Sequence, residues 1–570
     1  MSTAPQLPER AQRVEGPAPA AAAADAIRSG RAVLGIELGS TRIKACLIGD
    51  DPAVTIATGA HSWENRFVDR LWTYTLDDIW TGIRLAYADL ITDVRERYGV
   101  ELTQLKAIGV SAMMHGYLPF DADGELLVPF RTWRNTNTGA AAAELSELFG
   151  VNIPLRWSVA HVYQAVLDAE PHVPQIAFTT TLAGYVHWRL TGRKVLGVGD
   201  ASGMFPIDSA TGDYDENLLR RFDDLVSSRL PEREKRASTS GTVEGPTSAL
   251  TAPHAPLAAL LPEVLHAGQP AGELTPDGAA LLDSSGTLQP GAQLCPPEGD
   301  AGTGMVATNA VAPRTGNVSA GTSIFAMVVL ERALRHPHHE LDLVTTPAGD
   351  PVAMVHCNNG ASELAEWVGM FGRFAAAAGT PLDSDAVFEV LFREALGGEA
   401  DAGGLLAYNY LAGEPITATT EGRPLFVRTP DSRFTLGNVM RAQLYGVFGT
   451  LSLGMRVLAE EGVRLDRMHA HGGIFRTAGV AQRFLAAALD APVAVAETAA
   501  EGGAWGIAVL AAYLDEASDR DLAAYLSDRV FADAASQVVD PEPADVAGFA
   551  AYLDRYRDGL AVERAGADAL

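Results

Sequence analysis

Two short turns in the sequence combine glycine with hydroxyl residues between apolar, strand-like runs. The first is Gly39-Ser40-Thr41 within LGIELGSTRIKACLI, and the second is Gly321-Thr322-Ser323 within GNVSAGTSIFAMVVL. Such a turn points consecutive backbone N–H groups and hydroxyls at one spot, where they can bind phosphate oxygens without a helix. Either turn alone is more simply an ordinary hairpin connection. The pair, alike in type and order, indicates duplicated halves that face each other.

Charged side chains lie beside the first turn. In a strand, Arg42 and Lys44 share one face because side chains alternate with period two, so one of them could reach a terminal phosphate. Glu37, inside the preceding apolar run, is placed to hold Mg²⁺, through water, since this ion prefers carboxylate and phosphate oxygens. The alternative is a strand carboxylate that faces solvent, and the residues alone leave the two open.

Several other nucleotide-binding classes find no support. The sequence has no G-x-x-x-x-G-K-[ST] loop, and no G-x-G-x-x-G follows a strand and opens a helix. The formal net charge of −28 works against nucleic acid and anionic membranes, because such partners require a cationic surface. A phosphate-bearing ligand must therefore be held locally, by backbone N–H groups, a few Lys or Arg residues and a divalent cation.

Length and composition indicate a soluble protein of two large domains. A chain of 570 residues is too long for one core, because cores stop growing near ~250–300 residues. Hydrophobic residues make up 47% of the chain and charged residues 20%, enough apolar material to bury real cores. The three cysteines, Cys46, Cys295 and Cys357, have no metal-ligand or redox spacing, which suits a reducing cytoplasm.

The first thirty residues lack the basic head and Leu-rich centre of a signal peptide, so we expect a flexible or partly helical tail. No run of ~18 apolar residues predicts a membrane span. From Asp77, apolar residues at helical spacing predict a helix that stops near Gly99, and LKAIGVSAMM then predicts a strand. Strand, helix and strand in this order indicate an α/β fold with parallel strands.

Further along, Pro, Gly, Ser and Thr accumulate between Ser238 and Pro297, which predicts loops and short edge strands before a domain boundary. Near the C-terminus, HAHGGIFRTAGVAQRFLAAALDAPVAVAE predicts strand end, Gly-Gly loop, helix and strand, and EGGAWGIAVLAAYL predicts another helix. The stretch from about Asp515 onward predicts a terminal helical cap.

The ordered set of motifs resembles the FGGY family of carbohydrate kinases, and within it the xylulokinase-like branch. The matching pieces are GIELGSTRIK, MMHGYLPFDADGELLVPFRTW, PEGDAGTGM, GNVSAGTS, AYNYLAGEP, HGGIFRT and ETAAEGGAWGIAVLA. They cover about residues 31 to 515 in the family's order. The resemblance implies a two-domain actin-like ATPase (ribonuclease H-like) α/β fold with a central cleft. It places the sugar mainly on the first domain and ATP on the second.

The resemblance also implies roles for single residues. Asp300 matches the general base that takes the proton from the sugar hydroxyl, although alone it would be read as a turn residue. Met114 and His115 match the Met-His pair placed against the sugar, whereas a lone His is more often structural. Trp133 lies at a family tryptophan position. Asp200, in VGDASGMF, matches an Asp-Ala-Ser motif on the inner face of the sugar domain, and its alternative is a helix N-cap.

The nucleotide would be held at the phosphate and adenosine ends by different segments. Gly39, Ser40, Thr41, Lys44, Gly321, Thr322 and Ser323 would hold phosphates, with Glu37 on the metal. The loop at Gly472 and Gly473 would let backbone approach the adenosine closely, and its alternative is a simple strand-to-helix turn. The implied cofactors are ATP and Mg²⁺.

Three positions depart from the family pattern. Glu37 replaces the usual Asp of the first hairpin, which keeps the charge and moves it by one methylene. Ala301 follows Asp300 where relatives commonly have Asn or Gln, which removes an expected sugar contact. Arg134-Asn135 replaces the usual Asn-Asp type of pair.

The resulting expectation is a cytoplasmic kinase, a transferase of carbohydrate metabolism, that phosphorylates a ketose, D-xylulose to D-xylulose 5-phosphate. The alternatives are a kinase for another ketose or polyol such as L-ribulose and, from a different class, an actin-like nucleotide-binding sensor without sugar turnover. The predicted parts are a flexible tail (1–30), a sugar-binding domain (31–312), an ATP-binding domain (313–515) and a helical cap (516–570). The expected partners are a small-molecule sugar and ATP, with no nucleic acid and no membrane, and a homodimer is left open.

One cluster of histidines remains outside this scheme. HPHHE, from His336 to Glu340, has the residue types of a metal site. Adjacent residues point in different directions and the sequence shows no companion group of ligands, so a solvated loop is the expectation.

Overall fold

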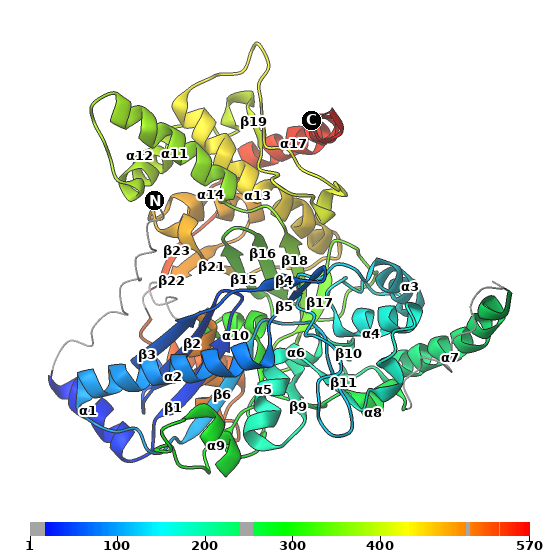
Figure 1. The fold of residues 1–570 in the computed structure, drawn as a ribbon. Coiled ribbons are helices and arrows are strands. Elements are labelled where there is room, and N and C mark those ends of the chain that lie inside the picture. Colours follow the sequence, from blue (N-terminus) through cyan, green and yellow to red (C-terminus); the bar gives the residue numbers. More distant parts are fainter. Residues whose placement is uncertain (1–16, 240–254, 497–501, 535, 570) are drawn as a thin grey trace. The chain divides into compact units, whose positions relative to one another are not determined.

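The computed structural model describes residues 17–239, 255–496, 502–534 and 536–569, and the chain in it forms two compact units (Figure 1). Unit 1 comprises Met1–Ala307, Val344–Gly349 and Thr498–Asp533, and unit 2 comprises Thr308–Leu343, Asp350–Glu497 and Ala534–Leu570. The chain therefore returns to unit 1 twice after leaving it. This division groups most of the predicted cap with unit 2 and a shorter part with unit 1.

Unit 1 is organised around a mixed sheet with the strand order β13-β6-β1-β2-β3, in which β14 also pairs with β6. The central hairpin is antiparallel, while β6 runs parallel to β1 and both β13 and β14 run parallel to β6. The strands are β1 (Val33–Leu38), β2 (Arg42–Ile48), β3 (Thr55–Ser62), β6 (Ala107–Ala112), β13 (Gln293–Leu294) and β14 (Glu298–Gly299). The first predicted hairpin and the predicted strand at LKAIGVSAMM are confirmed.

Two helices cover opposite faces of this sheet. Gly59 of β3 faces α2 (Leu76–Tyr98), because a Cβ built on it would lie 2.2 Å from the carbonyl oxygen of Ala86. Gly35 of β1 faces α15 (Gly502–Tyr513), because a Cβ there would lie 2.0 Å from the carbonyl oxygen of Ala504. Backbone thus meets backbone on both faces, which only residues without a Cβ allow.

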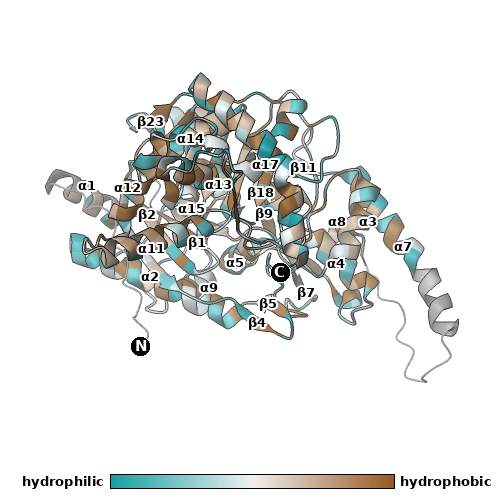
Figure 2. Ribbon diagram, turned by 90° about the horizontal axis from the view of Figure 1, so that it is seen from above, coloured by the Kyte–Doolittle hydropathy of each residue, from teal (hydrophilic) through white to brown (hydrophobic). Residues whose placement is uncertain are grey.

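Helix α2 forms and ends where the sequence predicts. Thr75 caps its start by accepting the N–H of Asp78 at 3.1 Å, and Asp77 and Asp78 place negative charge in the first turn. Gly99 ends it in the left-handed conformation with φ 61°. Polar and apolar residues alternate along this helix (Figure 2), as expected for a helix with one face in the core.

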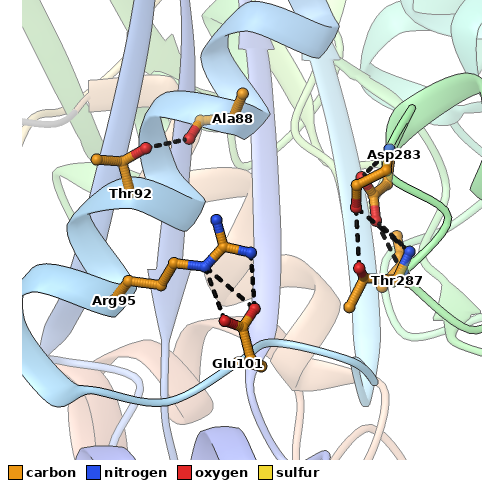
Figure 3. Close-up of polar contacts among 8 residues, drawn as sticks. Ala88, Thr92, Arg95, Glu101, Asp283 and Thr287 are labelled. Carbon is orange, nitrogen blue, oxygen red and sulfur yellow. Dashed lines mark hydrogen bonds and ion pairs between the residues drawn. The ribbon is translucent and has the colours of Figure 1, made fainter.

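The end of α2 is joined to the next segment by a surface ion pair (Figure 3). The Arg95 guanidinium donates to both oxygens of Glu101, at 2.9 Å from Nε to Oε1 and 2.8 Å from Nη2 to Oε2. Nearby, Asp283 accepts the backbone N–H groups of Thr287 and Ser285, which closes the turn after α9 (Pro276–Leu282). Both residues of the ion pair are about half exposed, so it orders the turn without adding much stability.

The remaining elements of unit 1 build on this sheet. They are α1 (Pro17–Arg28), β4 (Arg66–Val68), β5 (Leu71–Thr73), β7 (Leu118–Phe120), α3 (Gly139–Phe149), α4 (Ser158–Leu167), a 3₁₀ turn (Val173–Gln175), β8 (Phe178–Thr180), α5 (Leu182–Thr191), β9 (Val195–Gly197), α6 (Val198–Ala201), β10 (Ile207–Asp208), β11 (Asp213–Tyr214), α7 (Glu216–Thr239), α8 (Leu257–Leu260), β12 (Glu263–Leu265), α10 (Asp300–Ala307), α16 (Leu522–Tyr525) and a π-helix (Leu526–Val530).

Unit 2 contains most of a second mixed sheet, whose strand order is β17-β18-β16-β15-β21-β22-β23. Its hairpin of β15 and β16 is antiparallel and confirms the second predicted hairpin, and β21 runs parallel to β15. The elements are β15 (Thr315–Ala320), β16 (Ile324–Val329), β18 (Pro351–Cys357), α11 (Ser362–Ala377), α12 (Ser384–Leu396), β19 (Leu406–Tyr408), β20 (Leu425–Val427), α13 (Leu436–Glu460), β21 (Arg467–His471), α14 (Val480–Leu489), β22 (Val493–Ala496), β23 (Ser536–Val539), α17 (Pro543–Ala569) and 3₁₀ turns at Ala402–Gly404, Pro415–Thr417 and Gly473–Phe475; β17 (Asp342–Thr345) begins here and ends in unit 1.

At the two ends of the described chain, a helix forms in the tail expected to be flexible or partly helical, and a strand forms in the segment expected to be a helical cap. Residues 17–28 of the predicted tail form α1, and Ala23, Ala24 and Ile27 join the core of unit 1. After residue 535, β23 extends the sheet of unit 2 by pairing with β22. In the part of the chain that the structure describes, no helix is both long and apolar enough to cross a membrane.

The contact between Gly35 and α15 makes a prediction about stability. In Gly35→Ala, the new methyl group meets a main-chain carbonyl that cannot rotate away, so the helix must shift. We expect the free energy of unfolding of unit 1 to fall by about 1–3 kcal/mol, measured by urea denaturation followed through circular dichroism.

Gly139→Ala is the matched control, because a Cβ at this first residue of α3 meets no atom within 4 Å. It should leave stability unchanged or raise it by a few tenths of a kcal/mol, about what helix propensity gives. Equal effects of the two substitutions would contradict the packing argument.

Candidate active site

The carboxyl ends of β1 and β14, which flank β6 on either side in parallel, bring acidic residues to one edge of the unit 1 sheet. Asp300 follows β14 directly and is the first residue of α10. Its Oδ1 accepts the backbone N–H of Met114, just beyond β6, at 3.1 Å. The strands therefore place the predicted base beside the predicted sugar-contact residue.

Glu37 lies near the end of β1, opposite Lys44 in the hairpin register. Lys44 Nζ and Glu37 Oε2 are 3.5 Å apart, and the Glu37 side chain is 13% exposed. The same Oε2 accepts no hydrogen bond among the described residues. A carboxylate oxygen of this kind, in the electrostatic range of Asp300, fits a hydrated Mg²⁺, whose other ligands are water and phosphate oxygens.

The start of α15 packs directly on this carboxylate. A Cβ on Gly503 would lie 2.6 Å from Glu37 Oε1 and 2.9 Å from Thr303 Oγ1. The hydroxyl oxygen of Thr303 in turn lies 3.0 Å from Ser111 Oγ. Residues from β1, β6, α10 and α15 thus meet around Glu37.

The pKa of Asp300 is raised to about 6. Surrounding protein limits the hydration of the carboxylate and is the main cause, while the charge of Glu37 adds to the rise and the Met114 N–H opposes it. Asp300 nevertheless keeps exposed surface, so water and a substrate can reach it. A carboxyl group with this pKa accepts a proton at neutral pH better than an ordinary aspartate does.

Asp200 is fully buried and lies close enough to Asp300 for their charges to interact. The Thr181 hydroxyl donates to its Oδ2 at 2.5 Å, while Oδ1 accepts no hydrogen bond in the described chain. Burial raises the pKa of Asp200 to about 7, and the charge of Asp300 contributes. A Cβ on Gly299 would lie 3.2 Å from Asp200 Oδ1 and 2.8 Å from Met114 Cγ, so these two residues border the same short strand.

His115 has a left-handed backbone, with φ 70°, and a buried side chain. Its Nδ1 lies 3.2 Å from the carbonyl oxygen of Gly203, and its ring stacks on Trp157 at a centroid distance of 6.4 Å. Gly203 follows the helix that carries Asp200. The structure therefore brings Met114, His115 and Asp200 together, as a sugar pocket requires, and their contact with a sugar stays a prediction.

Trp133 belongs to a different group of contacts. The Arg134 guanidinium lies over the rings of Trp133 and Trp72, at 5.4 and 5.3 Å from the ring centroids. Asn135 exchanges hydrogen bonds with the backbone of Trp72, accepting its N–H and donating to its carbonyl, both at 2.9 Å. The Arg134-Asn135 pair thus orders the β5 segment, and the sugar contact of Trp133 stays a prediction.

Two aromatic residues hold the turn Gly39-Ser40-Thr41, the first of the two predicted phosphate turns. Trp63 Nε1 donates to the carbonyl of Gly39 at 2.8 Å, and the Tyr74 hydroxyl donates to the carbonyl of Ser40 at 2.6 Å. The Trp63 backbone N–H donates to the carbonyl of Thr41 at 3.1 Å. The Gly39 N–H already donates to the Arg42 carbonyl at 3.0 Å. The donors left to bind phosphate oxygens therefore come from Ser40 and Thr41.

Unit 2 contains a cavity of about 570 Å³ that two of the predicted nucleotide residues line. A Cβ on Gly472, where φ is 122°, would lie 2.1 Å from the carbonyl of Ala320, so the Gly-Gly loop packs against the end of β15. Gly321 and Gly473 line the cavity, while Thr322 and Ser323 continue the turn beside it. The second hairpin and the Gly-Gly loop are therefore parts of one site.

The cavity walls combine apolar surface with charged groups. Leu364, Phe388, Phe392 and Ile474 supply apolar surface, and charged residues border it. The charged lining residues are Asp385, Glu389, Arg393 and Arg476. A volume in this range and a mostly apolar lining suit a flat heteroaromatic ligand with polar edges.

Glu298 lies in the unit 1 candidate site, next to Asp200, and the sequence analysis did not single it out. It is 1% exposed, and its carboxylate accepts the N–H groups of Gly199 and Asp200 at 3.3 and 2.9 Å. Burial, together with the charge of Asp200, raises its pKa well above the usual range. Its position two residues before Asp300, in PEGD, was the available signal, but the partner loop lies about a hundred residues earlier in the chain.

Glu298 generates a prediction about pH and stability. Its folded pKa is higher than its unfolded pKa, so its contribution to stability is complete at low pH and is lost as pH rises. We expect the free energy of unfolding of the native chain to decline as the pH rises above the ordinary glutamate pKa of about 4.3, and to decline less steeply in Glu298→Gln, which cannot titrate at this position. Chemical denaturation at a series of pH values measures both slopes.

Glu298→Ala is the companion variant, because it removes the acceptor of two buried N–H groups. Relative to Glu298→Gln, which keeps an acceptor, it should lower stability by about 1–3 kcal/mol at every pH, because neither variant titrates at this position. Identical pH slopes in the native chain and Glu298→Gln would count against the raised pKa.

Comparison with solved structures shows the same fold. A xylulose kinase from Rhodospirillum rubrum superposes with a TM-score of 0.73 and 21% identity, over 93% of this chain and 99% of that one. A gluconate kinase from Lactobacillus acidophilus superposes with a TM-score of 0.72 and 16% identity, over 93% and 98%. The two-domain α/β fold of the actin-like ATPase class is thereby confirmed.

Sequence comparison shows the family. A glycerol kinase from Thermococcus kodakarensis is 25% identical over 222 residues, which are 37% of this chain and 44% of that protein, so the alignment spans less than half the length of this relative. The N-terminal domain profile of the FGGY family of carbohydrate kinases matches residues 32–261, and its C-terminal domain profile matches residues 316–514. These two matches cover most of the chain, which belongs to the FGGY family of carbohydrate kinases.

Proposed function

We propose that the protein transfers the γ-phosphoryl group of ATP to a hydroxyl of a ketose. The proposed ketose is D-xylulose, phosphorylated at its terminal hydroxyl. The observation that carries the proposal is the geometry at Asp300. An accessible carboxylate with a raised pKa lies against Met114 and close to a buried aspartate, Asp200. Acid groups of this kind serve proton transfer.

In the proposed reaction, Asp300 accepts the proton of the attacking hydroxyl as the oxygen bonds to phosphorus. Met114 and His115 position the sugar, and the buried Asp200 accepts hydrogen bonds from it. Lys44 and the turns at residues 39–41 and 321–323 hold phosphate oxygens. Glu37 would hold Mg²⁺, which would offset the negative charge of the phosphates.

The cavity in unit 2 is the proposed adenosine site. Its apolar walls would contact the base, and the Gly472–Gly473 loop would let backbone approach the nucleoside. The turn at Gly321, which borders the same cavity, would then lie toward the phosphates. A nucleotide bound in this way explains why the hairpin and the loop are built as one site.

Residues near the proposed sugar site favour one sugar over others. Met113-Met114-His115 favours D-xylulose over glycerol, because glycerol kinases of the family carry an Arg-Glu pair at this position. Ala301 leaves one sugar contact unfilled, so L-ribulose or another ketose or polyol is the second candidate. A nucleotide-binding sensor without sugar turnover is the rival from another class.

We place the enzyme in the cytoplasm, acting on small molecules. Cys46, Cys295 and Cys357 are free and buried, which is compatible with a reducing compartment. A homodimer remains an open arrangement.

The proposed function is tested by ADP release from Mg-ATP across a panel of ketoses and polyols. We expect one pentulose to stimulate turnover, and Asp300→Ala to reduce kcat by about 10²–10⁴-fold with little change in nucleotide affinity, because the base acts only on the hydroxyl proton.

Asp277→Asn, an exposed aspartate in the first turn of α9, is the matched control and should turn over normally. A panel in which no sugar raises ADP release above the sugar-free rate would favour the sensor. Full activity of Asp300→Ala would remove the base assignment while leaving the kinase class intact.

The raised pKa of Asp300 predicts the pH profile. The base works only when ionised, so kcat/KM should be level above neutral pH and fall tenfold per pH unit below about pH 6. An ordinary aspartate would place this fall near pH 4. Intrinsic fluorescence over the same range verifies that the protein stays folded, and a level profile down to pH 5 would contradict the prediction.

A further inference from the structure

A second cluster of chemically capable side chains lies within unit 2. His336 and His338 belong to the connection between β16 and β17, and Glu461 follows the last residue of α13. Glu461 Oε1 lies 3.0 Å from His336 Nδ1 and 2.9 Å from His338 Nε2. Glu461 is thus the companion ligand that the sequence analysis did not find for HPHHE.

The carboxylate of this cluster is buried and fixed. The Glu461 side chain is 4% exposed, and its other oxygen, Oε2, accepts the backbone N–H of Arg335 at 3.0 Å. The Arg332 guanidinium donates to the backbone carbonyl of Glu461 at 3.1 Å. These contacts leave Oε1 directed at the two imidazoles, with the Glu461 backbone held in place.

Glu461 also lies where a nearby cation is favourable. Its position beyond the C-terminal end of a 25-residue helix is unfavourable for an anion, since the helix dipole is negative there. A cation placed between the carboxylate and the imidazoles would relieve this repulsion.

We propose that His336, His338 and Glu461 form a binding site for Zn²⁺. This site is separate from every residue assigned to phosphoryl transfer, so the inference does not depend on the proposed function. Two imidazole nitrogens and a carboxylate oxygen are the donors that zinc takes in three-ligand protein sites, with water in the fourth position.

The existing geometry is close to what coordination needs. All three donor atoms lie within 4.8 Å of one another. Zinc bonds of about 2.0–2.2 Å in a tetrahedron put donor atoms roughly 3.3–3.6 Å apart. To reach this spacing, each imidazole nitrogen moves outward from Oε1 by a few tenths of an ångström, and the two nitrogens, which lie within 4.8 Å of each other, come to the same spacing.

The backbone restricts the movement of the two histidines. Pro337 separates the two histidines and fixes its own φ, so the two rings leave the chain from a stiff segment. His336 is 73% exposed, which gives an ion an entry path, while His338 is 21% exposed. Bound zinc would fasten the β16–β17 connection to the end of α13.

The donor set also selects the class of cation. Imidazole suits zinc and its transition-metal neighbours, whereas Mg²⁺ and Ca²⁺ prefer oxygen ligands alone. The metal of this site would therefore differ from the Mg²⁺ proposed at Glu37, and the two can be loaded independently.

The test uses the full-length chain without a histidine tag, stripped with a chelator and titrated with Zn²⁺ against a chromophoric competitor. We expect one strong zinc equivalent and a rise in the melting temperature of about 1–3 °C at saturation. His338→Gln and His336→Asn keep an N–H that can donate to Glu461 and lose the ligating nitrogen. Each should weaken zinc binding about tenfold or more, since each removes one of three protein ligands.

His339→Ala is the matched control. His339 is equally exposed at 73%, but its Nδ1 lies 3.2 Å from Glu340 rather than Glu461. This variant should bind zinc as the native chain does. Asp300→Ala should also bind zinc normally, which separates a failure of this site from a failure of the proposed kinase reaction.

Three results would overturn the proposal. One is the absence of a zinc equivalent above the background of the competitor, and another is unchanged affinity in both His336→Asn and His338→Gln. The third is a protein whose melting temperature depends on the protonation of these histidines and not on zinc, in which case the cluster is a hydrogen-bonded ion pair only.

Discussion

The close packing of α15 on the unit 1 sheet is the constraint on which the candidate site depends. The helix approaches β1 at Gly35 and β6 at Gly109, where a Cβ would lie 2.0 and 2.5 Å from helix carbonyls. It approaches α10 in the same way, since a Cβ on Gly506 would lie 2.2 Å from the Thr303 carbonyl. One helix therefore fixes the strand that carries Glu37 and the helix that begins with Asp300.

The same end of the unit 1 sheet also holds carboxyl groups that repel one another. Asp200, Glu298 and Asp300 all have raised pKa values, and in each case loss of hydration is the largest cause. Backbone N–H groups from Met114 and from the start of α6 offset part of the cost. The part of this hydration cost that the N–H groups do not offset makes the cluster hold protons more tightly than separate carboxyl groups would. Tighter proton binding is the condition for proton transfer near neutral pH.

Features encoded in short stretches of sequence were predictable. The two hairpins, α2 with its caps, and the strand-loop-helix order around Gly472 follow from local periodicity and turn residues, and the structure confirms them. Ordered motifs also identified the fold. Local patterns sufficed because each of these elements is specified by residues that are neighbours in the chain.

Contacts between distant segments were not predictable in this way. Nothing near Glu298 indicates that it receives N–H groups from Gly199 and Asp200, and nothing in HPHHE indicates Glu461. The predicted tail likewise gave no sign that Ile27 would enter the core of unit 1. These features depend on how elements pack, and a chain that is read one stretch at a time does not contain that information.

Two carboxylates at helix ends show that neighbouring groups, rather than the helix dipole, decide their chemistry. Asp300 begins α10, where the helix dipole favours an anion, yet restricted hydration and Glu37 raise its pKa, so the group can exchange a proton. Glu461 follows the end of α13, where the dipole opposes an anion, yet hydrogen bonds from two histidines and a backbone N–H keep its pKa low. The first carboxylate is suited to proton transfer and the second to holding a cation, because neighbouring groups outweigh the helix dipole in both places.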